Sequence, residues 1–216
     1  MSRARRTVRG RASVSGTGLH LGRACTLTFA PAEPGAGVVF VRTDVPDAAP
    51  VPALVAHAVQ TERRTQLGTG DAAFHTVEHV LAAVAGLGVD DLRIECTGPE
   101  PPIADGSAAA FVEALTAAEI VSHGGTVEPI LVRRPIRVTD GTSVYEALPS
   151  PGLTLDVTIE FPHPAIGRQR TALAVTPESF ARDLASARTF GFVHEVEALR
   201  ARGLIQGGSL ENALVL

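Results

Sequence analysis

The residues with the clearest chemical potential are Glu78 and His79, which are adjacent in the segment HTVEHVLAAVAGLG at 75–88. A neutral imidazole is a common zinc ligand. A carboxylate beside a metal site can take a proton from metal-bound water. The same two residues can also lie at the start of a helix and do no chemistry. Their types and spacing therefore allow zinc-assisted hydrolysis without requiring it.

Two zinc-hydrolase motifs overlap in this segment. Counted from His75, the residues match the inverted zinc-protease pattern H-x-x-E-H, with two histidines one helical turn apart and the glutamate as base. The second motif uses only the four residues from Thr76 to His79 and gives His75 no role. Spacing alone does not decide between them, so the rest of the chain must.

A helix is predicted around Glu78. Alanine, leucine and valine favour or tolerate helices, and apolar residues recur at helical spacing over 77–84. The glycines at positions 86 and 88 are expected to end the helix. We expect Thr76 to be the N-cap, and a carboxylate in the first turn complements the helix dipole.

Composition indicates an ordinary globular protein. Of 216 residues, 45% are apolar and 19% are charged, and the net charge of -4 argues against nucleic-acid binding as the main activity. All 19 cationic residues are arginines. Cys25 and Cys96 lie far apart in the sequence, and we expect both to be buried and reduced.

Targeting signals are not evident in the sequence. No apolar stretch is long enough to span a membrane, and the basic residues 1–9 lack the apolar run of a signal peptide. We therefore expect a cytoplasmic protein with no transmembrane segment and no nucleic-acid partner. The basic N-terminus is expected to fray in solvent, although its arginines could also make a peripheral contact with an acidic membrane surface.

Strands and then helices are predicted in the first half of the chain. The alternation over 24–29 and the glycine-rich turn at 16–20 predict a hairpin. Three prolines stiffen the loop 98–107, where Asp105 or Ser107 can cap the next helix. So rigid a loop either only starts that helix or also holds something beside it. The other predicted elements are strands at 38–42 and 91–96, two short strands within 54–67, and a helix at 108–119.

The second half repeats this order of elements after a candidate linker at 121–126. Thr176 and Pro177 are a strong helix start. The apolar strand at 212–216 is expected to need a partner that the sequence does not contain. The other predicted elements are strands at 130–138, 142–148 and 153–161, a helix continuing to about 187, and a short helix near 194–202.

Seven motifs distributed along the chain occur in the order found in one known enzyme family. They are GTGLH from Gly16, TVEH from Thr76, AGLGVD from Ala85, the loop from Pro99 to Ala108, FPHPAI from Phe161, ARTFGF from Ala187, and RGL with GGS from Arg202 to Ser209. Each motif alone is weak. Together they resemble the UDP-3-O-acyl-N-acetylglucosamine deacetylases, the zinc amidases of lipid A biosynthesis, over nearly the whole chain.

The resemblance implies an α+β fold of two similar domains, at residues 1–121 and 127–216. Each domain would be a small mixed or antiparallel sheet with helices packed on one face. The family's other two zinc ligands lie in a later His-x-x-x-Asp motif, and a further histidine follows them; this chain contains neither feature. The second domain would then be incomplete, and the abrupt apolar end favours a C-terminally truncated copy.

Roles for individual residues also follow from the resemblance. Glu78 would be the general base, His79 a zinc ligand, and Thr189 a donor to the oxyanion. A second set would line the acyl channel or lie near the substrate, although each member could instead be a core, turn or strand residue. The channel residues would be Phe190, Phe192, Val196 and Gly208, and the residues near the substrate would be Leu19, Phe161 and His163.

The implied activity is zinc-dependent deacetylation of UDP-3-O-acyl-N-acetylglucosamine, with release of acetate. The protein would act as a monomer on this acylated UDP-sugar. The alternative is a catalytically inert fragment or binding module that keeps the acyl-sugar groove without the metal. The protease pattern at His75 explains no other part of the chain and is the least favoured interpretation.

Overall fold

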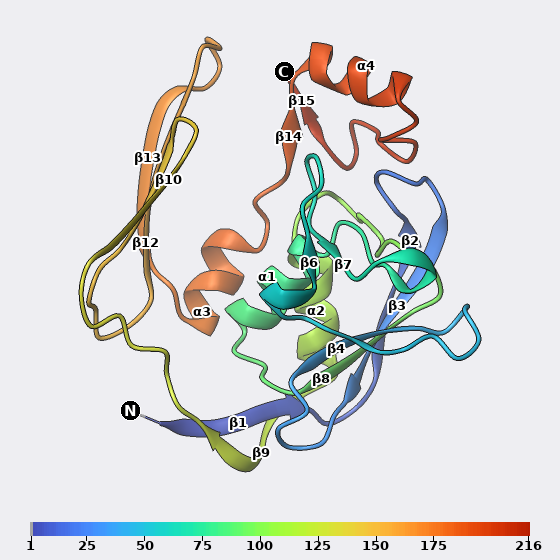
Figure 1. The fold of residues 1–216 in the computed structure, drawn as a ribbon, viewed down its shortest axis with the longest axis vertical. Coiled ribbons are helices and arrows are strands. Elements are labelled where there is room, and N and C mark those ends of the chain that lie inside the picture. Colours follow the sequence, from blue (N-terminus) through green and yellow to red (C-terminus); the bar gives the residue numbers. More distant parts are fainter. Residues whose placement is uncertain (1) are drawn as a thin grey trace.

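The computed structural model describes residues 2–216, and its largest element is a five-stranded mixed sheet (Figure 1). The strand order is β2-β3-β8-β4-β5, in which only the β4–β8 pair is parallel. The hairpin and the strands predicted near 38–42 and 91–96 are confirmed. The strands are β2 (Ala12–Thr17), β3 (Ala24–Pro31), β4 (Val38–Arg42), β5 (Val51–Pro52) and β8 (Leu92–Cys96).

Two helices, α1 (Glu78–Gly86) and α2 (Ala109–Ala117), contribute with this sheet to one hydrophobic core. Alternate residues of β3 and β8 enter the core, while the residues between them are more exposed. The rings of Phe29 and Phe111 meet edge to face at 6.4 Å. Burying one such side chain stabilises the fold by about 1.5–3 kcal/mol. The α+β class is confirmed.

The sequence predicted the start of α2 better than the start of α1. Thr76 does not cap α1, which begins at Glu78 without a side-chain cap. The backbone of Thr76 has φ +54°, and its hydroxyl is turned away to donate to the buried carboxylate of Glu100. The start of α2 follows the prediction more closely, because the hydroxyl of Ser107 accepts from the N–H of Ala109 at 3.1 Å.

The N-terminal arm is a strand and not a frayed end. Strand β1 (Arg3–Val8) pairs antiparallel with β9 (Ile120–Val127), so the segment 121–126 that was expected to be a linker lies within a strand. Arg5 makes two hydrogen bonds of 2.6 Å to Asp91, whose carboxylate is buried. The basic residues suggested a solvated end because their carboxylate partners lie some 85 positions away in the chain, and a local sequence pattern does not reveal such partners.

The second half begins with two separate antiparallel hairpins. The strands β10, β12 and β13 lie on the left of Figure 1, apart from the helices. Most of their side chains are exposed on both faces, so among residues 2–216 these strands form no single helix-covered sheet. Strand β13 was not predicted. The hairpins are β10 (Ile136–Asp140) with β11 (Ser143–Ala147), and β12 (Thr154–Phe161) with β13 (Gly167–Ala174).

The next helix joins the core of the first half. Helix α3 (Pro177–Ser179) starts with the predicted Thr176 cap and continues into a π-helical turn at Phe180–Leu184. Phe180 packs so closely on α1 that a Cβ at Gly86 would lie 2.3 Å from its ring. The division into domains at 1–121 and 127–216 stays a prediction.

The C-terminal segment folds back on itself. Strand β14 (Phe190–Gly191) pairs in parallel with β15 (Leu214–Val215), and α4 (Val193–Ala201) lies between them in the sequence. The expectation that the terminal strand needs an outside partner is therefore wrong, because β14 pairs with it. The remaining elements are the short strands β6 (Ala58–Val59) and β7 (Gln66–Leu67) and two 3-10 turns at Val55–His57 and Gly70–Ala72.

Two further expectations concern the cysteines and the membrane. Cys25 and Cys96 are both buried free thiols, as predicted. No helix within residues 2–216 combines the length and apolarity needed to cross a bilayer.

Candidate active site

Glu78 and His79 lie at the start of α1 and line a hollow of about 450 Å³. Both side chains are half-buried. The carboxylate of Glu78 accepts a hydrogen bond of 3.0 Å from the backbone N–H of Thr65, in the loop between β6 and β7. This contact directs one carboxylate oxygen toward the loop. The hollow thus contains an oriented carboxylate beside an imidazole.

Aromatic residues from the second half form another wall of this hollow. Phe161, Phe190 and Phe192 all line it, and their ring centroids lie 5.6–6.0 Å apart. The ring of His163 lies 5.6 Å from that of Phe192, so His163 supports the aromatic wall without lining the hollow itself. Three phenylalanines from two motifs of the second half therefore line the hollow together with Glu78, and His163 packs on one of them.

Thr189 lies in the same hollow and is fixed by its backbone. Its N–H donates to the carbonyl of Gly106 at 2.8 Å, and its carbonyl accepts from the N–H of Leu214 at 3.1 Å. A Cβ at Gly106, where φ is +85°, would lie 2.0 Å from the carbonyl oxygen of Asn212. Only glycine fits there. The rigid loop 98–107 therefore holds Thr189 as well as starting α2.

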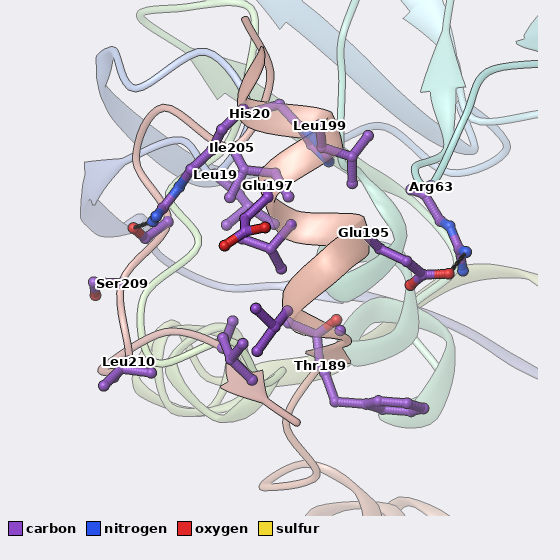
Figure 2. Close-up of a pocket in the computed structure, with 18 residues that line it drawn as sticks. Leu19, His20, Arg63, Thr189, Glu195, Glu197, Leu199, Ile205, Ser209 and Leu210 are labelled. Carbon is purple, nitrogen blue, oxygen red and sulfur yellow. Dashed lines mark hydrogen bonds and ion pairs between the residues drawn. The ribbon is translucent and has the colours of Figure 1, made fainter. Parts of the chain in front are cut away.

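A second, more apolar cavity of about 300 Å³ adjoins this hollow (Figure 2). Thr189, Phe190 and Gly191 line both, as do Arg63 and Glu195, which form an ion pair beside α4. The predicted residues Leu19, Val196 and Gly208 line the second cavity. Its other apolar side chains are Val193, Leu199, Ile205, Leu210, Ala213 and Val215.

Burial controls the charge of the imidazole in the hollow. Desolvation lowers the pKa of His79, and the negative charges of Glu78 and Asp105 oppose that effect. A lowered pKa keeps the ring neutral at neutral pH, which is the form that binds a metal ion. His79 is thus suited to donate to a metal ion.

Comparison with known proteins relates the chain to one family. Residues 5–216 match the family described as LpxC: UDP-3-O-acyl N-acetylglycosamine deacetylase. The deacetylase of Citrifermentans bemidjiense is 43% identical over 210 residues, covering 97% of this chain and 69% of that protein. The deacetylase of Myxococcus xanthus is 44% identical over 211 residues, covering 98% and 67%.

The chain belongs to this deacetylase family. A bifunctional enzyme LpxC/FabZ from Chlorobaculum tepidum is also similar, with 40% identity over 213 residues that cover 98% of this chain and 46% of that protein. The chain spans about two thirds of the length of the deacetylases of Citrifermentans bemidjiense and Myxococcus xanthus.

A zinc ion, which the family resemblance implies, needs several donor side chains close together. A catalytic zinc ion takes three protein ligands and keeps one open position. Within residues 2–216, no three histidine, cysteine, aspartate or glutamate side chains form a cluster that could hold a metal ion. The described residues therefore do not fit a complete zinc site, and His79 could supply one donor.

The protease motif does not match the geometry of this chain. His75 lies three residues before α1, and the backbone between them turns through the left-handed conformation at Thr76. The N–H of His75 instead donates to the carbonyl of Pro99 at 2.8 Å. His75 and His79 are therefore not one turn apart on a common helix, as the inverted motif requires.

Three contacts of the candidate site were not predicted from the sequence. Thr65 holds Glu78, the Arg63–Glu195 ion pair joins the β6–β7 loop to α4, and Glu100 is buried beneath the start of α1. Glu100 belongs to a motif that supported the family resemblance, but nothing in its sequence neighbourhood indicated burial. These contacts join segments far apart in the chain, so local patterns carry no signal for them.

Proposed function

We propose that this chain provides the general base, one zinc donor and the acyl cavity of an amidase acting on UDP-3-O-acyl-N-acetylglucosamine in lipid A biosynthesis. The observation that carries the proposal is the shared wall between the hollow of Glu78 and His79 and the apolar cavity, in a chain of the deacetylase family. The proposal includes action as a monomer in the cytoplasm, with peripheral contact to a membrane surface.

In the proposed reaction, the carboxylate of Glu78 takes a proton from the water that attacks the acetyl carbonyl. The hydroxyl of Thr189 donates to the developing oxyanion. The bond between the carbonyl carbon and the sugar nitrogen then breaks, the nitrogen gains a proton, and acetate leaves. His79 would be one ligand of a zinc ion that polarises the carbonyl and the water. The other ligands would have to lie outside residues 2–216.

The acyl chain is proposed to occupy the second cavity. Its volume of about 300 Å³ is within the range of ligand pockets, and its wall is mainly aliphatic. Val196 and Gly208, which the resemblance assigns to the acyl channel, would contact the chain directly, and Phe190 would lie between the chain and the reacting group. Leu19, which the resemblance places near the substrate, lines the same cavity and would also contact the acyl chain. Phe192, which the resemblance assigns to the channel, lines the hollow instead and would form the wall nearer the sugar with Phe161 and His163. Each buried methylene would favour binding by about 0.8 kcal/mol.

The test compares acetate release from the acylated UDP-sugar and from UDP-N-acetylglucosamine without an acyl chain. Val196→Trp would fill the cavity and exclude two or three methylenes, so kcat/KM for the acylated substrate should fall about 10–100-fold. Val157→Trp is the matched control, because Val157 is half-exposed on the β12–β13 hairpin. Equal turnover of both substrates by the unmodified full-length protein would contradict the acyl-cavity assignment, and no acetate release from either substrate by that protein would contradict the amidase.

A further inference from the structure

Glu100 is a buried carboxylate, with 1% of its surface exposed, and it accepts hydrogen bonds from two separate segments. One segment is the turn after β2, where the backbone N–H groups of His20 and Leu21 donate at 2.9 and 2.7 Å. The other is the start of α1, where the hydroxyl of Thr76 donates at 2.7 Å. A buried charge is costly unless it is hydrogen-bonded. These contacts therefore fix the two segments relative to Glu100.

The contact with Thr76 determines how the chain enters α1. Thr76 has φ +54°, a conformation that is unfavourable for a β-branched residue and needs support from its surroundings. That support comes from the Glu100 carboxylate and from the carbonyl of Pro99, which accepts from the N–H of His75. Glu78 follows only two residues later. The loop 99–100 thus sets the first turn of the helix that carries Glu78.

Glu78 has a separate contact that reports its position. Its carboxylate accepts from the N–H of Thr65 at 3.0 Å, on a loop that does not touch Glu100 through any hydrogen bond among residues 2–216. If the start of α1 moved, this bond would lengthen. Exchange of the Thr65 amide hydrogen therefore monitors the placement of Glu78.

The contacts with His20 and Leu21 determine one wall of the apolar cavity. A Cβ at Gly18 would lie 2.5 Å from the Glu100 carboxylate, so the turn can lie against this group only with glycine there. The carbonyls of Leu19 and His20 accept from the N–H groups of Gly207 and Gln206 at 3.0 and 3.1 Å. Glu100 thereby also determines the position of the loop before Gly208.

We propose that Glu100 is a positioning residue for the amidase, holding the base Glu78 in register with the wall of the acyl cavity. Its buried carboxylate acts through Thr76 on the start of α1 and through the turn at 18–21 on the cavity. This inference rests on the proposed function, because it assigns Glu78 as the base. Glu100 itself contacts neither substrate nor water in the reaction.

The main test removes only the Thr76–Glu100 hydrogen bond. In the full-length protein, Thr76→Val should lower kcat about 10–100-fold, the expected effect of a small misplacement of a catalytic group, with KM changed by less than about threefold. Thr76→Ser keeps the hydroxyl and should restore most of kcat. Thr116→Val is the matched control, because it removes an exposed hydroxyl that bonds only within α2.

Glu100→Gln tests the other side of the contact. Glutamine replaces one acceptor oxygen with an amide group that would face the donors of Thr76, His20 or Leu21, so the same loss of kcat is expected. If this variant does not fold, Thr76→Val still decides. Unchanged kcat in Thr76→Val, a rise in KM alone, or equal loss in Thr76→Ser would overturn the proposal.

Hydrogen exchange gives a readout that is independent of activity. In Thr76→Val the amide of Thr65 should exchange about fivefold faster, the effect of losing roughly one net hydrogen bond, while it stays unchanged in Thr116→Val. Unchanged exchange at Thr65 would overturn the positioning role. If the unmodified protein released no acetate, the proposed function would fail, but exchange at Thr65 would still show whether Glu100 positions Glu78.

Discussion

At the scale of single residues, two buried carboxylates hold distant parts of the chain together. Glu100 joins the turn at 18–21 to the start of α1, and Asp91 joins β1 and β9 to the sheet. Asp91 accepts from Arg5, from the ring of His123, and from the backbone N–H groups of Gly35 and Gly37. Because every partner is a donor, the ionised form of Asp91 is the form that the fold stabilises.

These donors hold the pKa of Asp91 far below its usual value of 3.8, against the opposing effect of burial. A carboxylate with a depressed folded-state pKa stabilises the fold above its unfolded-state pKa, and this stability is lost as pH falls toward the folded-state value. The free energy of unfolding should therefore fall between about pH 5 and pH 2. In Asp91→Asn this fall should be smaller, although the variant is less stable at pH 7.

Chemical denaturation across this pH range checks the prediction. Asp140→Asn, at the exposed end of β10, is the control and should keep the pH dependence of the unmodified protein. If the free energy of unfolding fell equally steeply with pH in Asp91→Asn and in the unmodified protein, Asp91 would not be the cause of this pH dependence.

At the scale of elements, the loop 98–107 organises both sides of the candidate site. Glu100 lies under the start of α1, and Gly106 holds the backbone of Thr189 through its carbonyl. The three prolines predicted a stiff loop, and the contacts of this loop with Thr76 and Thr189 show that it does more than start α2. The sequence could not identify what the loop holds, because Thr189 lies more than 80 positions away.

Gly106→Ala should lower the melting temperature more than Gly141→Ala. Both glycines have positive φ, at +85° and +56°, so alanine costs about 1–2 kcal/mol at each. Only at Gly106 would the new Cβ also collide with a backbone atom, the carbonyl oxygen of Asn212. The space around Gly141 is open. Thermal unfolding measures the melting temperatures of the two variants. An equal decrease in both would mean that Asn212 does not lie close to Gly106.

The predictability of each element followed from its hydrophobic pattern. Strand β3 was predicted because its residues alternate between core and solvent, and β13 was missed because four consecutive polar residues at 168–171 leave no apolar alternation. The pairing of β1 with β9 was missed because arginines and glycines replace any apolar alternation there. Strand pairing between distant segments depends on partners that a local pattern does not contain.

At the scale of the whole molecule, the two halves meet at the candidate site. Phe180 packs on α1, and Thr189 and the phenylalanines of the second half line the hollow of Glu78. The family was recognisable from the sequence because its motifs are distributed over nearly the entire chain, and the comparison with relatives confirms it. The roles of the individual residues stay predictions, since neither the fold nor the family match tests them.

The most direct test of the central claim measures acetate release and zinc content on the same samples of the full-length protein. Glu78→Ala should lower turnover of the acylated UDP-sugar by about 10²–10⁴, the usual contribution of one acid–base group, with zinc content unchanged. His79→Ala should lose both zinc and turnover, whereas Glu113→Ala, which removes an exposed carboxylate on α2, should lose neither. Unchanged turnover in Glu78→Ala, or full zinc content in His79→Ala, would contradict the account.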